Sequence, residues 1–137
     1  MERTLAIIKP DAVAAGNTGP IIQRIEAEGF QIRAMRLVRL TRADAEGFYA
    51  VHRERPFFGQ LVDFMASGPA IVLALEAPAA IRQWRTAMGA TNPERADSGT
   101  IRKDFGTSIE RNATHGSDAA ETAAFEIGYF FAGRELL

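Results

Sequence analysis

A histidine and a glutamate near the end of the chain have the types and spacing of a nucleophile and its orienting partner. His115 lies in the run NATHGSD (112–118), and Glu126 interrupts the apolar side of the helical pattern that follows. Helical spacing points Glu126 toward the buried side or its edge, where a carboxylate needs a partner. If Glu126 holds one ring nitrogen of His115, the other nitrogen is free to attack. Pairing of Glu126 with a surface arginine or with Ser117 fits the spacing equally well.

An anion is the natural reactant for such a histidine. His115 is expected just before the N-terminus of the last helix, where unpaired N–H groups and the helix dipole favour negative charge. Taken alone, the heptapeptide fits a solvated turn histidine better. Basic and amide side chains from separate segments change that reading, because gathered around His115 they would form a polyphosphate site. They are Lys9, Arg85 and Arg102, with Thr91 and Asn112 as neutral donors.

Several other chemistries find no support in the sequence. There is no GxxxxGK[ST] loop, no GxGxxG turn and no cysteine, and the only two histidines, His52 and His115, form no metal-binding pair. The 16 basic and 17 acidic side chains give a net charge of −1, which offers no general field for nucleic acid or an acidic membrane. The apolar run LAII is too short for a signal peptide or a membrane span. We therefore expect a soluble, cytoplasmic protein.

Strands and helices that would position these residues alternate along the chain. Strands are expected at 3–8, 31–41, 69–77 and near Ala113 and Thr114; helices are expected at 16–30, 41–52, 56–68, 78–89 and 119–131, with mostly loop at 90–106.

Local signals refine these boundaries. Pro10 is expected to end the first strand, and Thr18 to cap the first helix. The alternation of the second strand breaks near Leu37, which suggests a bulge there. Capping boxes are expected for Thr41 with Asp44 and for Asp118 with Glu121.

The order of elements predicts an α/β fold of the α+β type, a ferredoxin-like split β-α-β sandwich. Its four-stranded antiparallel sheet would carry helices on one face, and the helices at 41–52 and 56–68 would form an inserted helical hairpin. The nearly apolar segment 69–77 is typical of a strand buried on both faces in the middle of a sheet. With 137 residues and no repeat or linker, the chain is expected to be a single domain over residues 1–137.

The chain resembles the nucleoside diphosphate kinases along essentially its whole length. NATHGSD is similar to the signature of that family, and three further segments match in order: TLAIIKPDAV, FYAVHRERPFFGQLVDFMASGP and MGATNPERADSGTIRKDFG. The resemblance implies an enzyme whose His115 takes the terminal phosphate of a nucleoside triphosphate, mainly ATP, and passes it to a nucleoside diphosphate. A shared site and a phosphohistidine imply ping-pong kinetics.

The same resemblance implies a role for each motif residue. Glu126, with Ser117 beside it, would orient the His115 ring, and Lys9 and Tyr49 would lie close to the transferred phosphate. The implied nucleotide contacts are Lys9, Phe57, Leu61, Arg85, Thr91, Arg102 and Asn112. A base stacked on Phe57 implies broad base and sugar tolerance, since every base offers a π face. Magnesium would arrive on the nucleotide phosphates, with no protein ligand.

The sequence also leads to an expectation about the oligomeric state and to one alternative function. The resemblance implies a dimer as the common unit, and the short ending FFAGRELL favours a tetramer of two dimers over a hexamer, with a lone dimer as the alternative. The alternative function is that of a non-catalytic module that binds nucleotide or single-stranded nucleic acid on the same scaffold. Such a module would not need His115 and Glu126 together. Neither a membrane nor an obligate nucleic-acid partner is expected.

Overall fold

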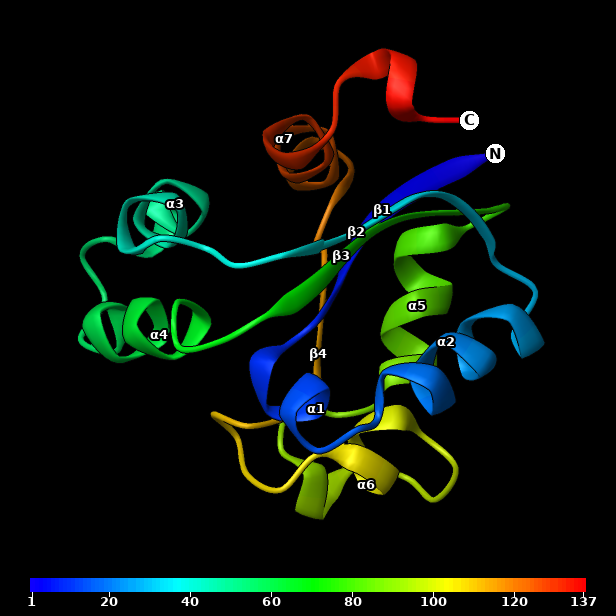
Figure 1. Cartoon of the computed structure of the whole chain (residues 1–137). Helices are drawn as coiled ribbons and strands as arrows, with labels where there is room; N and C mark the ends of the chain where they lie inside the picture. Colours follow the sequence, from blue (N-terminus) through cyan, green and yellow to red (C-terminus); the bar gives the residue numbers. More distant parts are fainter.

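A four-stranded antiparallel sheet runs through the middle of the molecule in the computed structural model, which describes residues 1–137 (Figure 1). The strand order is β2-β3-β1-β4, with β1 at Glu2–Ile8, β2 at Gln31–Val38, β3 at Ala70–Ala77 and β4 at Thr114–Gly116. All residues of β3 are buried, as its apolar run predicts. The predicted fold class is confirmed.

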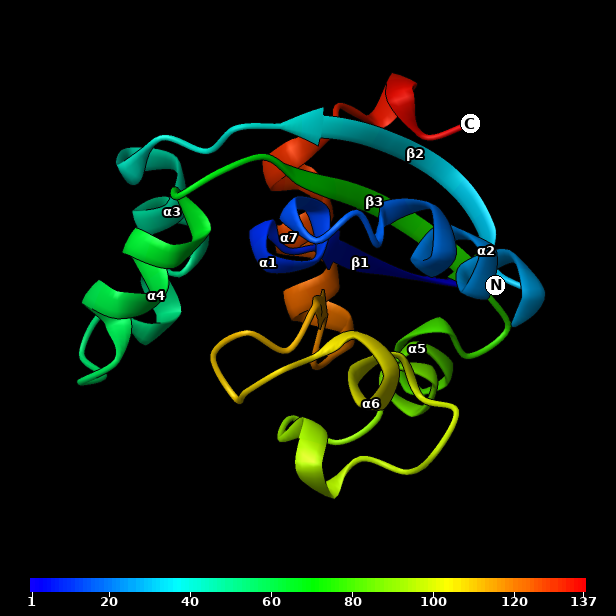
Figure 2. The same ribbon diagram turned by 60° about the horizontal axis from the view of Figure 1, so that its bottom comes forward.

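Helices pack against both faces of this sheet (Figures 1 and 2), whereas the sequence analysis placed them on one. The seven α-helices are α1 (Pro10–Ala14), α2 (Thr18–Ala27), α3 (Arg42–Phe48), α4 (Phe58–Met65), α5 (Ala80–Met88), α6 (Ile101–Phe105) and α7 (Ala120–Phe130). Short 3-10 helices occur at Ala50–His52, Pro93–Arg95 and Gly133–Glu135. Successive side chains of a strand point to opposite faces, so the apolar run of β1 supplies both cores.

Each face has its own core. On one face, Ile25 of α2 and Trp84 of α5 pack with Ile8 of β1. On the other, Phe48 of α3 and Met65 of α4 pack with the inner residues of β1 and β3, and α7 completes that core. The predicted hairpin is therefore present as α3 and α4, and its role is to cover the second face at one end of the sheet (Figure 1).

Two short helices were missed by the sequence analysis. Pro10 does follow the first strand, but it also begins α1, because a proline at the first helical position lacks only an N–H that would be unpaired anyway. Helix α6 lies in the segment that was expected to be mostly loop. Thr100 caps it: the Thr100 hydroxyl accepts a hydrogen bond from the Lys103 N–H at 3.3 Å.

Of three local features predicted for β2, α2 and α3, two lie at other positions in the structure and one is confirmed. The bulge of β2 falls between Ile32 and Ala34, not near Leu37. Asn17, not Thr18, precedes α2. The Thr41 and Asp44 capping box is confirmed.

The last helix is also capped differently from the prediction. Thr122, not Glu121, reaches back to the start of α7, where its hydroxyl accepts from the Ala119 N–H at 2.9 Å. Asp118 caps nothing and pairs with Arg85 instead. His115 belongs to strand β4 and not to a turn before the helix. Pairing of β4 with β1 fixes the backbone of His115 on one side.

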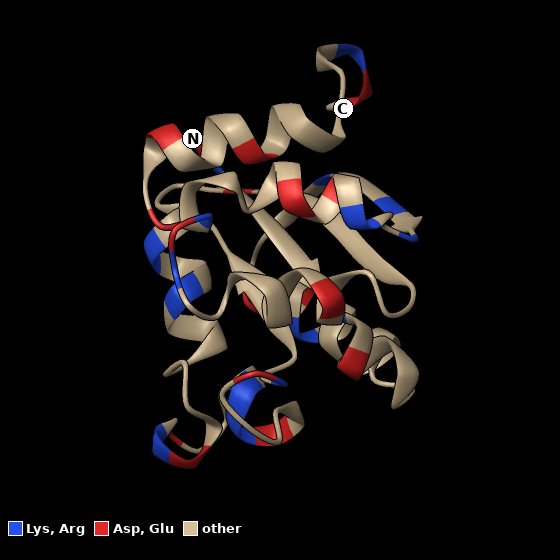
Figure 3. Ribbon diagram, turned by 90° about the vertical axis from the view of Figure 1, so that its left-hand side faces the viewer, with Lys and Arg blue, Asp and Glu red and all other residues tan.

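Charged residues of both signs are interspersed along the ribbon (Figure 3), in agreement with the net charge of −1. No helix is long and apolar enough to cross a membrane. Because charges of both signs are mixed over the molecule, an anion can bind only where several cations lie together, and such a group lies near β4.

Candidate active site

The backbone of His115 is held on two sides. His115 pairs with Ile7 of β1 in the sheet, and its carbonyl oxygen accepts a hydrogen bond from the Trp84 Nε1 at 3.0 Å. The next residue, Gly116, lies so close to α5 that a Cβ would stand 2.5 Å from Trp84 Cδ1. Only glycine fits there, so helix α5 and the sheet together fix where the His115 ring begins.

Glu126 of α7 fixes the orientation of that ring. Its Oε1 lies 2.8 Å from His115 Nε2 and also accepts from the Ser117 hydroxyl at 2.8 Å. Ser117 Oγ in turn accepts from the Leu5 N–H at 3.1 Å. Two of the partners considered for Glu126, His115 and Ser117, therefore bind it together. Because Nε2 faces Glu126, Nδ1 is the ring nitrogen left for chemistry.

A cleft of about 200 Å³ opens beside this ring. Seven residues proposed from the sequence line it, namely Lys9, Tyr49, Leu61, Arg85, Thr91, Arg102 and His115, together with His52, Thr114, Gly116 and Asp118. The other predicted site residues lie around it. Ser117, Glu126 and Asn112 are behind its wall, and Phe57 is 46% exposed, with its ring 5.7 Å from that of His52. The fold thus gathers residues from distant segments at one end of the sheet.

Lys9 brings a buried cation to the cleft. Its ammonium donates to Asn112 Oδ1 at 2.7 Å, and the Asn112 amide donates to the Thr91 carbonyl at 3.1 Å. Burial, and to a lesser degree the charge of Arg102, lowers the pKa of Lys9 to about 8. Lys9 is therefore close to losing its charge, and an anion in the cleft would favour its charged form.

The two arginines of the cleft are held in different ways. The buried Arg102 donates to the carbonyl oxygens of Gly89 at 3.1 Å and Thr114 at 2.9 Å, while its Nε has no partner. Burial, and then Arg85, lowers the pKa of Arg102 to about 10. Arg85 is half exposed and pairs with Asp118 at 2.8 Å. Neither guanidinium is fully satisfied by the protein, so both retain donors for an anion.

Tyr49 lies edge-on to His115. Its ring centroid is 6.3 Å from that of His115, at an angle of 86°. The phenol is buried and its hydroxyl has no hydrogen-bond partner in the chain. Burial, followed by the nearby Glu126 carboxylate, raises the pKa of Tyr49 far above its ordinary value. Tyr49 therefore stays protonated and offers a hydrogen-bond donor near His115.

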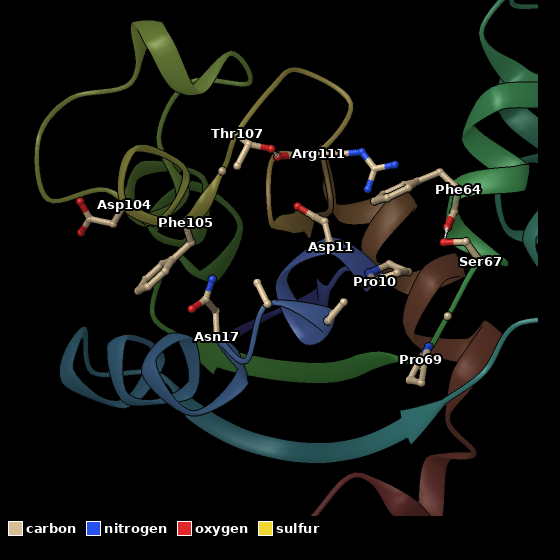
Figure 4. Close-up of a pocket in the computed structure, with 14 residues that line it drawn as sticks. Pro10, Asp11, Asn17, Phe64, Ser67, Pro69, Asp104, Phe105, Thr107 and Arg111 are labelled. Carbon is tan, nitrogen blue, oxygen red and sulfur yellow. Dashed lines mark hydrogen bonds between the residues drawn. The ribbon is translucent and has the colours of Figure 1, made fainter.

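A second, larger cavity of about 510 Å³ lies beside Pro10 and Asp11 (Figure 4). Its wall includes Asp11, Phe64 and Arg111 but none of the residues that surround the His115 ring. The smaller cleft holds the histidine, the lysine and both arginines, so it is the candidate active site. No group of three or more His, Cys, Asp or Glu side chains is placed to hold a metal ion.

Comparison with known proteins assigns the chain to a family. A family model described as nucleoside diphosphate kinase matches residues 2–136. The nucleoside diphosphate kinase of Syntrophotalea carbinolica is 62% identical over 137 residues, which is 100% of both chains. That of Desulfosudis oleivorans is 60% identical and covers 100% of this chain and 99% of its own. The chain belongs to the nucleoside diphosphate kinase family.

Solved structures of the family share the fold closely. The Aquifex aeolicus nucleoside diphosphate kinase superposes with a TM-score of 0.97 at 46% identity and covers 99% of each chain. The Halobacterium salinarum enzyme, solved in complex with CDP, gives a TM-score of 0.94 at 39% identity over 99% of this chain and 91% of its own. The protein is therefore a nucleotide-binding kinase, a transferase of phosphate between nucleotides.

The structure also brings to the site residues that the sequence analysis did not select. Asp118 was expected as a helix cap, yet it lines the cleft. His52 lies on the cleft wall with its ring 6.4 Å from that of Tyr49. Asp11 accepts from the Ala113 N–H at 3.1 Å, two residues before His115. The proximity of Asp11 to Lys9 in the sequence was the one signal that could have pointed to it.

Proposed function

We propose that this kinase transfers the terminal phosphate of a nucleoside triphosphate, mainly ATP, to a nucleoside diphosphate through a phosphohistidine on His115. The single observation that carries the proposal is the contact of His115 Nε2 with Glu126 at 2.8 Å, which leaves Nδ1 free beside a cationic cleft. The catalytic domain would span residues 1–137.

In the first half-reaction, Nδ1 of the neutral ring attacks the γ-phosphorus. The Nδ1–P bond forms, the bond from phosphorus to the β,γ-bridging oxygen breaks, and the nucleoside diphosphate leaves with that oxygen. The proton on Nε2 stays in place and donates to Glu126. The ring then carries a positive charge, which the Glu126 carboxylate offsets. In the second half-reaction, a terminal oxygen of another diphosphate attacks the same phosphorus and returns the neutral ring.

The cations of the cleft would stabilise the charge that moves in both steps. Arg102 is held by backbone carbonyls and so presents its remaining donors without reorganising, as an electrostatic catalyst should. Lys9 and the protonated Tyr49 would meet the transferred phosphate, while Arg85 and Thr91 would contact the other phosphates. Because donor and acceptor would use one site in turn, ping-pong kinetics follow.

Magnesium would enter with the nucleotide. The cleft itself offers one carboxylate, Asp118, which is already paired with Arg85, whereas magnesium prefers several oxygen ligands and binds readily through substrate phosphates. When bound, the ion would neutralise phosphate charge. The residues of this chain would position the phosphates that hold it.

The outer part of the cleft supports broad substrate tolerance. Phe57 presents an exposed ring on which a base could stack, and Leu61 lines the cleft below it. Stacking accepts all bases equally well, since no base edge is read. The Lys9 and Asn112 pair is available to the sugar hydroxyls. We propose ribo- and deoxynucleotides of any base as substrates.

We also propose that the enzyme assembles from dimers, with a tetramer favoured over a hexamer, and that it acts in the cytoplasm. The lack of cysteine supports the second point, because such a chain gains nothing from an oxidising compartment.

The test is to mix the protein with ATP labelled on the γ-phosphate, without an acceptor, and then add GDP. We expect acid-labile label on His115 that appears in GTP after GDP is added. A His52→Asn variant, which lacks the other histidine of the chain, should still take up label. If ATP binds but no label is transferred, the phosphohistidine mechanism is wrong and the cleft only binds nucleotide.

A further inference from the structure

Ala113 has a backbone conformation that alanine rarely adopts. Its φ of +73° makes it the one residue other than glycine with a positive φ. For an L-residue with a Cβ this left-handed region is unfavourable, and neighbouring contacts must hold the residue there. Ala113 is fully buried and stands two residues before His115. Its conformation therefore decides how the chain enters strand β4.

Residues at the start of the chain hold Ala113 from two sides. Its N–H donates to Asp11 Oδ2 at 3.1 Å, and its carbonyl oxygen accepts from the Lys9 N–H at 2.9 Å. The Lys9 contact uses backbone atoms, which any residue at that position would supply. The contact from Asp11 is the one that depends on a side chain. Asp11 is thus the one residue whose side chain binds the backbone of Ala113.

The Asp11 carboxylate has no competing hydrogen bond. Its Oδ1 is buried without a partner in the chain, while Oδ2 binds the Ala113 N–H. In Figure 4 the side chain lies between helix α1 and the segment that carries Thr107 and Arg111, on the wall of the 510 Å³ cavity. A carboxylate in the first turn also favours the helix that follows. Helix α1 has only five residues, however, and gains little from this.

The geometry around Ala113 continues directly to the nucleophile. The Thr114 carbonyl accepts from Arg102, and the His115 carbonyl accepts from Trp84. Glu126 then meets the His115 ring from a different element, α7. A change in φ at Ala113 would rotate the chain between these fixed points. The His115 ring could then no longer direct Nε2 toward Glu126 and Nδ1 toward the cleft at the same time. A displacement of a reacting atom by about 1 Å can slow a reaction roughly 100-fold.

We propose that Asp11 is a positioning residue for phosphate transfer: its carboxylate holds Ala113 in the left-handed conformation and so keeps Nδ1 of His115 aimed into the cleft. Asp11 does not touch the substrate in this role. The inference rests on the proposed function of His115 as the phosphate acceptor.

The test compares variants by the rate at which ATP phosphorylates His115. Asp11→Ala removes the acceptor, and the rate should fall by roughly 10- to 100-fold. Asp11→Asn keeps an oxygen that can accept from the Ala113 N–H, and its rate should stay within about 3-fold of the wild-type rate. If the Asp11 charge acted instead through Lys9, Asp11→Asn would be as slow as Asp11→Ala. That result would overturn the proposal.

A double variant tests the role of the backbone itself. Glycine adopts a positive φ without cost, so Asp11→Ala combined with Ala113→Gly should recover most of the rate lost in Asp11→Ala. A double variant no faster than Asp11→Ala would contradict the proposal. Asp104→Ala is the matched control, because Asp104 lines the same cavity but pairs with Arg24 and does not contact Ala113. Its rate should equal that of the wild type.

Amide hydrogen exchange at Ala113 gives a readout that needs no phosphate transfer. The amide should be protected in the wild type and in Asp11→Asn, and should exchange at least about 10-fold faster in Asp11→Ala. If the three proteins show these exchange rates but the wild type takes up no label from ATP, the proposed phosphate transfer is wrong, whereas the contact between Asp11 and Ala113 is still supported. If the wild type takes up label, but Asp11→Ala changes neither the rate of His115 phosphorylation nor the exchange of the Ala113 amide, only the positioning role of Asp11 is wrong.

Discussion

Strand β1 joins two clusters of charge that are built in opposite ways. At its first residues, the Glu76 carboxylate of β3 binds Arg3 at 2.9 Å and Arg33 of β2 at 2.8 Å, so each arginine meets the carboxylate. Beyond its last residue, Lys9 shares the cleft with Arg85, which pairs with Asp118, and with Arg102, whose buried Nε has no partner.

The pKa shifts record the same difference. At the first cluster, hydrogen bonds from Arg33 and then Arg3 hold the pKa of Glu76 below its ordinary value, which means that the fold favours the charge. At the second, burial lowers the pKa of Lys9 and Arg102, which means that the fold opposes those charges. A cluster in which every charged group has an oppositely charged partner, here called balanced, contributes to stability. A cluster that remains unbalanced without its ligand is typical of a site for an anion.

The largest effect should come from removing the proposed nucleophile of the unbalanced cluster. His115→Ala should lower phosphate transfer by roughly 10⁴-fold or more, because no other group can form the intermediate. Nucleotide binding should change by less than about 3-fold, since the cations remain. Steady-state kinetics and calorimetric titration with ADP would measure the two quantities. Retained transfer in this variant would show that the chemistry does not take place on His115.

Glu126 should have the next largest effect. Glu126→Gln keeps a hydrogen-bond acceptor for His115 but cannot offset the charge on the phosphorylated ring, so kcat should fall roughly 100-fold. Ser117→Ala leaves the carboxylate in place and removes one of its donors, and it should cost roughly 10-fold. If kcat falls by the same factor in both variants, Glu126 acts through its hydrogen bonds and not through its charge.

Much of the fold follows from local patterns in the sequence. The apolar runs of residues 3–8 and 69–77 predict the two central strands, because a strand that is buried on both faces carries apolar side chains on both. Helix α1 was missed because Pro10 can end a strand and begin a helix equally well. Helix α6 has five residues, too few for a periodicity to emerge from its glycine- and proline-rich surroundings.

The site is predictable to the extent that it depends on spacing within one element. The inward direction of Glu126 follows from helical spacing, but the choice between His115 and Ser117 does not, because it depends on how α7 lies against β4. The sequence gives only the proximity of Asp11 to Lys9, which does not reveal the contact of Asp11 with Ala113. The role of Asp11 depends on a positive φ at Ala113, and a sequence suggests that conformation only where glycine or asparagine occurs.

Lys9 should make nucleotide binding sensitive to pH. With its pKa near 8, its ammonium loses a proton as the pH rises from 7 to 9, while Arg102, with a pKa near 10, stays charged. If only the charged form binds phosphate well, KM should rise about 10-fold over this range. KM measured at pH 7, 8 and 9 checks this, with Lys9→Met as the control whose KM should be higher and flat. A flat profile in the wild type would mean that Lys9 is not part of the unbalanced cluster.

The smallest effect on activity should come from the balanced cluster. Glu76→Gln leaves Arg3 and Arg33 without their carboxylate, so the melting temperature at pH 7 should fall by roughly 3–5 °C. The lowered pKa of Glu76 stabilises the fold above the ordinary carboxyl value of 4.5 and ceases to do so as the pH falls through the folded-state pKa. The difference between wild type and variant should therefore narrow below about pH 4.

The exposed pair of Asp63 with Arg42 supplies the matched control for Glu76→Gln. Asp63→Asn should barely change the melting temperature, because exposed ion pairs contribute little. Both variants should keep the wild-type kcat, since neither carboxylate faces the cleft. A lowered kcat in Glu76→Gln with an unchanged melting temperature would mean that the two ends of β1 are coupled. The separation of a stabilising cluster from a functional one would then be wrong.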